Sequence, residues 1–177
     1  FKAGLRDIVD RYQLELRLTP NQDVLLCNIG SAQRNSVRDA LSDLGMQTPE
    51  APPPLARHAI ACPALPTCGL AITESERILP KVLERLDAQL SRLEIEKSLL
   101  FRMTGCPNGC ARPYMAELAL VGSGVNQYQL WLGGSANLQR LAKPFLQRMP
   151  LDELESTLEP LLVSWKQAGG RRGFGDP

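Results

Sequence analysis

Two stretches of the sequence, ACPALPTC at residues 61–68 and TGCPNGC at residues 104–110, each carry a pair of cysteines. The first pair is a C-x5-C motif, wider than the roughly two to four intervening residues usual in a zinc knuckle. In the second pair, a C-x3-C motif, Pro107 and the Asn108-Gly109 dipeptide favour a tight turn. Such a turn can point two sulfur atoms and several backbone N–H groups to one side. The four candidate ligands are Cys62, Cys68, Cys106 and Cys110.

Two loops that each offer two sulfurs suit an iron–sulfur cluster. A [4Fe–4S] cluster is held by converging thiolates, and nearby N–H donors and limited solvent access set its reduction potential. A tetrahedral zinc site can use the same ligands. Four unligated cysteines are the third possibility. Spacing alone therefore leaves an iron–sulfur cluster, a zinc site and a set of free thiols open.

The fifth cysteine, Cys27, makes the cysteine number odd, and the sequence shows no pattern of cationic, apolar and small residues typical of a secretory leader. Both features argue against a disulfide framework and favour a reducing compartment. Cys27 lies in the apolar run at residues 24–29, where we expect it to pack as a small hydrophobic side chain.

The composition is that of an ordinary globular protein, with 44% hydrophobic and 22% charged residues. The 20 basic and 19 acidic side chains almost cancel, which argues against a general nucleic-acid or membrane-surface binder. No apolar run approaches the roughly 20 residues that span a bilayer. Because the first residue is Phe1 rather than Met, we expect the chain to be a piece of a longer protein.

The N-terminal segment predicts the order helix, strand, strand, helix. Apolar residues at helical spacing mark a helix over residues 5–12, and Leu14, Leu16 and Leu18 alternate with charged residues as in a strand. Residues 24–29 form a second strand, and residues 36–44 a helix that Gly45 ends. This pattern predicts half of a ferredoxin-like α/β sandwich at residues 1–48, with an open sheet that should pair with another element.

A proline-rich linker over residues 49–56 is predicted to precede a second domain at residues 57–177. Thr73 and Glu76 have capping-box spacing before a long amphipathic helix, and Asp152 and Glu155 repeat this signal before a second helix. Residues 99–103 predict a strand that runs into the second cysteine pair. Residues 116–121 and 128–132 predict a hairpin whose turn is Gly122-Ser123-Gly124.

The residues around the cysteines add a family resemblance. ACPALPTCGLAITESERILP at residues 61–80 and RMTGCPNGCARPYMAELALVG at residues 102–122 resemble the paired motifs of siroheme-containing nitrite and sulfite reductases. They look most like the ferredoxin-dependent assimilatory sulfite reductases, and YQLWLGGS and LAKPF continue the likeness downstream. Upstream, RLTPNQDVLLCNI at residues 17–29 resembles the second ferredoxin-like half-domain of these enzymes. The resemblance implies the C-terminal half of such an enzyme, an α+β chain in which a ferredoxin-like half-domain precedes the α/β siroheme/4Fe-4S nitrite/sulfite reductase domain.

Carried onto this chain, the resemblance implies that Cys62, Cys68, Cys106 and Cys110 ligate a [4Fe–4S] cluster. It also implies that Cys110 is the catalytic cysteine, whose sulfur bridges the cluster to the iron of siroheme. In the family the RLTPNQ motif faces siroheme, which implies contacts from Arg17, Asn21 and Gln22. The amide of Asn108 could donate to a cluster sulfur or to a siroheme carboxylate. Arg17 could equally be a solvent-exposed charge on a strand that contacts no ligand. Asn108 could serve only to form the turn.

The activity implied is the six-electron reduction of sulfite to sulfide, with ferredoxin as electron donor. The basic residues that hold sulfite are expected in the N-terminal half of the enzyme, so the fragment alone should be inactive and either cofactor could be absent from it. The alternatives are a siroheme nitrite reductase fragment and a non-catalytic, apo or zinc-binding, fragment. We expect no nucleic-acid or membrane partner, and a location in the cytoplasm, as in cyanobacteria, or in the plastid stroma.

Overall fold

The computed structural model describes residues 1–46, 52–97, 99–135, 137, 139–169 and 173–174. It forms two compact units, Phe1–Pro53 and Pro54–Pro177. The predicted linker at residues 49–56 spans the boundary between the units, and its residues 49–51 lie outside the described residues. Each unit has its own apolar core, so each is described by itself.

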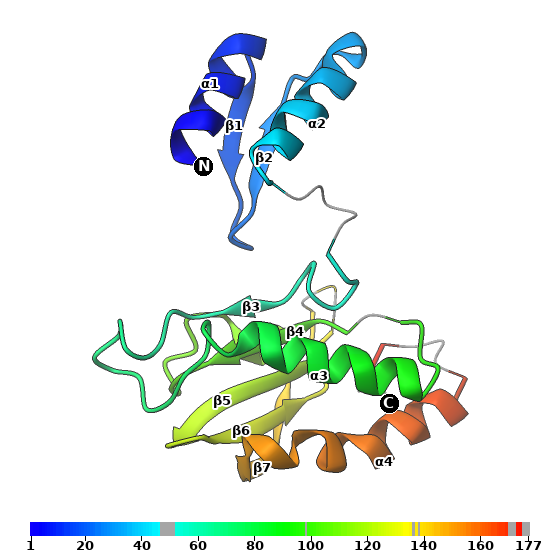
Figure 1. The fold of residues 1–177 in the computed structure, drawn as a ribbon. Coiled ribbons are helices and arrows are strands. Elements are labelled where there is room, and N and C mark those ends of the chain that lie inside the picture. The colour runs from blue at the N-terminus through cyan, green and yellow to red at the C-terminus, as the bar shows by residue number, and fades with distance from the viewer. Residues whose placement is uncertain (47–51, 98, 136, 138, 170–172, 175–177) are drawn as a thin grey trace. The chain divides into compact units, whose positions relative to one another are not determined.

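The first unit has the predicted order of helix, strand, strand and helix (Figure 1). Its elements are α1 (Lys2–Tyr12), β1 (Glu15–Leu18), β2 (Val24–Cys27), the short 3-10 helix η1 (Ser31–Gln33) and α2 (Arg34–Asp43). The two strands are antiparallel, with Leu16 opposite Leu26. The predicted second helix is confirmed, although it begins at Arg34, and Gly45 follows it with a positive φ of 71°.

One face of this two-stranded sheet packs on the helices. Ile8 of α1, Leu14 and Val37 of α2 form the buried core, and Leu26 packs against it. Because side chains alternate along a strand, Arg17 and Leu25, which are register partners, lie on the opposite face. Leu25 is 51% exposed, so this face presents apolar surface as well as charge.

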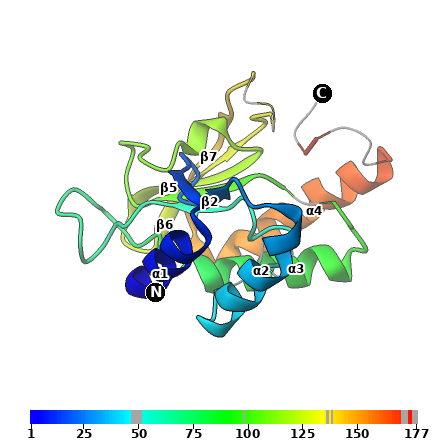
Figure 2. The same cartoon turned by 90° about the horizontal axis from the view of Figure 1, so that it is seen from above.

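The second unit is a mixed five-stranded sheet with two long helices on one face (Figures 1 and 2). The strand order is β3-β4-β5-β6-β7, in which β4 is parallel to β3 and β5 and the other pairs are antiparallel. Its elements are β3 (Ile60–Ala61), α3 (Leu79–Arg92), β4 (Phe101–Thr104), η2 (Pro113–Met115), β5 (Leu118–Gly124), β6 (Gln127–Leu132), β7 (Lys143–Pro150), η3 (Leu151–Glu153) and α4 (Leu154–Gln167).

The main core lies between this sheet and the helices α3 and α4. It takes Leu86 from α3, Leu158 from α4 and the side chains of Phe101 and Met103 from β4. Alternation along β4 therefore turns Arg102 and Thr104 to the opposite face of the sheet. On that opposite face a second, smaller apolar cluster is formed by Ile60, Cys62, Ala64 and Ala111.

Three local predictions for the second unit are wrong. Thr73 does not cap a helix, because its hydroxyl is buried against the hydroxyl of Tyr128 at 3.2 Å and α3 begins only at Leu79. Glu155 does not cap α4, because its carboxylate binds Arg85. Gly122, Ser123 and Gly124 continue β5, and the hairpin turns at residues 125–126 instead, where Asn126 takes a positive φ.

Candidate metal centre

The two cysteine loops begin at the carboxyl ends of neighbouring parallel strands. Cys62 directly follows β3, and Cys106 follows β4 after Gly105. Because β3 and β4 are parallel, both loops start at the same end of the sheet. The backbone N–H of Gly105 donates to Sγ of Cys62 at 3.3 Å. Strand pairing thus brings two cysteine pairs that are distant in the sequence to one place.

The first loop folds back on itself and onto the second. The N–H of Cys68 donates to the carbonyl of Ala64 at 2.7 Å, and Ala64 has a positive φ of 51°. After Cys68, the N–H groups of Ile72 and Thr73 both donate to the carbonyl of Gly105, at 2.9 and 3.1 Å. The loop that carries the first pair is therefore tied at both ends to the strand that leads to the second pair.

Gly105 has no room for a side chain. A Cβ there would lie 2.5 Å from the carbonyl oxygen of Thr73 and 2.6 Å from Cβ of Ala64. A Cβ on Gly122 of β5 would lie 2.3 Å from the carbonyl oxygen of Gly105. These glycines let three backbone segments meet beneath the cysteine loops.

The second loop is a tight turn that Tyr114 holds from outside. The N–H of Arg112 donates to the carbonyl of Gly109 at 2.7 Å, and Gly109 has a φ of 68°. The hydroxyl of Tyr114 donates to the carbonyl of Pro107 at 2.7 Å, and its ring contacts Trp131 edge to face. Burial, and then the charge of the nearby Cys106, raise the pKa of Tyr114.

The four cysteines differ in their exposure. Cys62 and Cys106 are buried, Cys68 is half-buried and Cys110 is exposed. Within the part of the chain that the structure describes, no three Cys, His, Asp or Glu side chains stand close enough together to hold a metal ion. The chemistry of the donor set nevertheless fits an iron–sulfur cluster, because it consists of four thiols on two neighbouring loops and the Gly105 N–H group already donates to one of their sulfurs.

A buried cation lies on the same face of the sheet. Arg102 of β4 is 2% exposed, and its Nη1 donates to the carbonyl of Arg112, two residues beyond Cys110, at 3.1 Å. Sequence reasoning missed Arg102, Gly105 and Tyr114. The signal for Arg102 was a charged residue between Phe101 and Met103, in a strand that should be buried.

The other predicted site residues lie on exposed turns and strands. Asn108 is exposed at the tip of the second cysteine loop. Arg17 belongs to the first unit, where it pairs with Glu15 at 2.7 Å on β1. Asn21 and Gln22 form the turn between β1 and β2, in which the N–H of Asn21 donates to the Thr19 hydroxyl and Gln22 has a φ of 66°.

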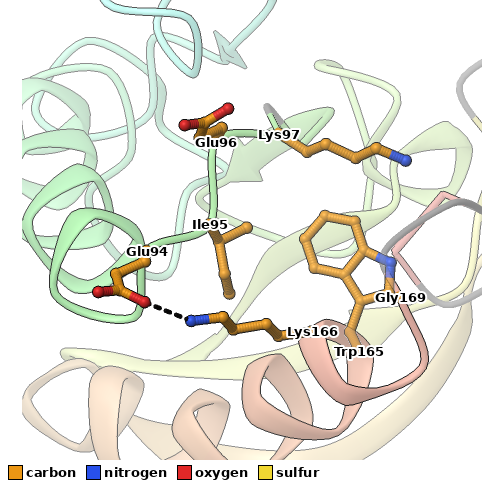
Figure 3. Close-up of a pocket in the computed structure, with 7 residues that line it drawn as sticks. All are labelled: Glu94, Ile95, Glu96, Lys97, Trp165, Lys166 and Gly169. Atoms are coloured by element: carbon orange, nitrogen blue, oxygen red, sulfur yellow. Dashed lines mark hydrogen bonds and ion pairs between the residues drawn. The ribbon is translucent and has the colours of Figure 1, made fainter.

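A shallow pocket of about 230 Å³ lies away from the cysteines, where α3 and α4 end. Figure 3 shows Trp165 and Ile95 in this pocket between two lysines, Lys97 and Lys166. Lys166 pairs with Glu94 at 2.8 Å. None of the residues that line it is a predicted site residue, so the cysteine loops remain the candidate centre.

The described part of the chain contains no helix with the length and apolar character needed to cross a membrane.

Comparison with known proteins identifies relatives along nearly the whole chain. Residues 1–44 match the family described as the nitrite/sulfite reductase ferredoxin-like half domain. The chain is 52% identical, over 99% of its length, to the sulfite reductase [ferredoxin] of Synechococcus elongatus, of which it covers 28%. It is 43% identical, over 98% of its length, to the sulfite reductase [NADPH] hemoprotein beta-component of Xylella fastidiosa, of which it covers 31%.

The fold also has a counterpart among solved structures. The Mycobacterium tuberculosis NirA protein matches 98% of this chain with a TM-score of 0.75 and 21% identity, and the match covers 33% of the NirA chain. The chain spans less than a third of the length of the curated relatives described above. The chain is an α+β homologue of the sulfite reductases, and its first 44 residues match the ferredoxin-like half-domain of the nitrite/sulfite reductase family.

Proposed function

We propose that this chain is the part of a ferredoxin-dependent sulfite reductase that holds a [4Fe–4S] cluster and siroheme, and that it lies within the C-terminal half of that enzyme. The observation that carries the proposal is the pair of cysteine loops at the ends of β3 and β4, joined by the Gly105 N–H to Cys62 Sγ bond. The donor named for the Synechococcus relative, at 52% identity, supports ferredoxin as the electron source.

For three of the four cysteines, the exposure of the residue supports a proposed role. Cys62 and Cys106 are buried at the base of the loops, where they would hold the inner side of a cluster out of water. Cys110 is exposed, so its sulfur is accessible to a second group on its outer side. We therefore propose that the thiolate of Cys110 would hold both the cluster and siroheme. When bound, the cluster would supply one-electron transfer and siroheme would supply an iron that binds sulfite.

Four other residues of this chain are proposed to bind siroheme and to orient it. In the first unit, Arg17, Asn21 and Gln22 are proposed to contact siroheme, and the exposed guanidinium of Arg17 is suited to a carboxylate. In the second unit, Asn108 presents an exposed amide beside Cys110 for the same purpose. Sulfite, ferredoxin and the remaining two thirds of the enzyme are the proposed substrate and partners, with the sulfite-binding cations outside this chain.

The test is a protein of the relatives' full length that contains this chain. We expect siroheme absorption, and sulfide formed from sulfite when reduced ferredoxin is supplied. Cys110→Ser should abolish sulfide formation, whereas Cys27→Ser, in the other unit, should retain it. Faster turnover of nitrite than of sulfite would reassign the protein to the nitrite reductases. Purification with zinc and without siroheme would overturn the proposal.

A further inference from the structure

Arg102 occupies a position where a cation is costly. It is the second residue of β4, and its neighbours Phe101 and Met103 are both fully buried in the main core. Its own side chain lies on the opposite face of the sheet, between its register partners Ile60 of β3 and Ala119 of β5. Both partners are apolar and buried, so the aliphatic part of the Arg102 side chain is surrounded by apolar residues that water does not reach.

The guanidinium has few partners for its degree of burial. Its Nη1 donates to the Arg112 carbonyl, but its Nε is buried and has no hydrogen-bond partner among the residues that the structure describes. No carboxylate in those parts of the chain forms an ion pair with it. Burial, and then the positive charge of Arg112, lower the pKa of Arg102. A buried cation in this state destabilises the fold unless an anion compensates it.

The surroundings of Arg102 indicate where that anion would lie. The carbonyl that Arg102 binds belongs to the turn after Cys110, and Ile60 packs in one cluster with Cys62 and Ala111. The side chain of Arg102 therefore lies under both cysteine loops. Four thiolates around an iron–sulfur core carry a net negative charge, and reduction adds another electron to it. A fixed cation on this face would stabilise the reduced form more than the oxidised form.

We propose that Arg102 is a positioning residue for the cluster: it holds the Cys110 turn through the Arg112 carbonyl and supplies the buried positive charge that compensates the thiolate-bound cluster. This role rests on the proposed function, since it requires that the cysteines hold a cluster. It also explains why an arginine stands in a strand whose neighbours are apolar. The cation is unfavourable in the empty fold and favourable once the negative charge is present.

The first measurement is the midpoint potential of the cluster in the anaerobically reconstituted chain, followed by electron paramagnetic resonance of the reduced form. Arg102→Met should shift the potential to more negative values, and Arg102→Lys, which keeps the charge, should stay near the unsubstituted chain. Arg148→Met is the matched control, because it removes an exposed cation from β7 of the same sheet. An unchanged potential in Arg102→Met, or an equal shift in Arg102→Lys, would overturn the proposal.

The second measurement separates charge compensation from a purely structural role. Without iron, Arg102→Met should unfold at the same temperature as the unsubstituted chain or at a higher one, because the variant removes an uncompensated buried cation. After reconstitution it should lose iron to a chelator faster. Equal destabilisation with and without the cluster would mean that Arg102 only braces the loop. If the unsubstituted chain takes up no cluster, both this role and the proposed function fail; a cluster with an unchanged potential removes this role alone.

Discussion

The backbone N–H of Gly105 lies 3.3 Å from Sγ of Cys62 and donates to it, which links the strand leading to one cysteine pair with the first cysteine of the other. The carbonyl of the same residue accepts from Ile72 and Thr73, at the exit of the first loop. Gly105 therefore ties the entry and the exit of the first loop to β4. In a loaded site, an N–H donor to a ligand sulfur also raises the reduction potential of the cluster.

Gly105→Ala should damage both the fold and the site. A Cβ there would lie 2.5 Å from the Thr73 carbonyl oxygen and 2.6 Å from Ala64 Cβ. The Thr73 oxygen belongs to the backbone, which cannot move away without disturbing the loop. We expect a loss of about 1–3 kcal/mol in the free energy of unfolding of the second unit, from overpacking. Iron uptake on reconstitution should fall with it. Urea unfolding and iron analysis measure the two effects.

Gly69→Ala is the control for this substitution, because it lies in the same region and nothing stands within 4 Å of the added Cβ. Its free energy of unfolding should stay within about 0.5 kcal/mol of the unsubstituted chain. If Gly105→Ala and Gly69→Ala behaved alike, the close approach at Gly105 would not constrain the loops.

Tyr114→Phe should loosen the second cysteine loop without dismantling the unit. The substitution removes the 2.7 Å hydrogen bond to the Pro107 carbonyl and leaves the ring contact with Trp131. A single such bond contributes about 1 kcal/mol. We expect unfolding to become easier by that amount, and a reconstituted cluster to be released faster to a chelator. Release at the rate of the unsubstituted chain would show that Tyr114 does not hold the loop.

Arg85 and Glu155 link α3 to α4 and should make stability depend on pH. The guanidinium binds both carboxylate oxygens of Glu155 and the Leu151 carbonyl. Burial raises the pKa of Glu155, but the hydrogen bonds from Arg85, a hydrogen bond from the backbone of Glu155 itself and the charge of Arg85 together outweigh burial, so the net shift is downward. A lowered folded-state pKa stabilises the fold above the pKa of the unfolded chain and stops doing so as the pH falls through the folded value.

Arg85→Met should therefore cost about 1–2 kcal/mol near neutral pH, and this difference should shrink as the pH falls below the usual carboxyl pKa and through the lowered pKa of Glu155. Urea unfolding across that range measures it. Arg92→Met breaks the solvent-exposed pair with Glu159 at 2.7 Å and is the control, with a smaller effect that added salt removes. A pH-independent loss in Arg85→Met would assign its effect to packing rather than to the charge on Glu155.

The parts of the fold that were predictable are those with strong local periodicity. Leu5 and Ile8 at helical spacing predict α1, and the alternation from Leu14 to Leu18 predicts β1. The edge strand β7 was not predicted, because its residues such as Lys143 and Arg148 are mostly exposed and show no clean alternation. The capping boxes were wrong because tertiary contacts of Thr73 and Glu155 compete with the local pattern.

For the site, the sequence predicted the cysteines but not their support. The spacing and the turn residues Pro107 and Asn108 point to ligand loops without any knowledge of the sheet. The Gly105 N–H to Cys62 bond depends on the parallel pairing of β3 and β4, which local patterns do not specify. The burial of Arg102 depends in the same way on which strands flank β4.

The most direct test of the central claim is iron and acid-labile sulfide analysis of the chain after anaerobic reconstitution, with Cys110→Ser and Cys27→Ser beside it. A [4Fe–4S] site held by the four cysteines of the two loops predicts about four irons and about four sulfides per chain. The content should fall in Cys110→Ser and stay unchanged in Cys27→Ser. Zinc without sulfide, or no metal in the unsubstituted chain, would contradict the claim that these cysteines form a cluster site.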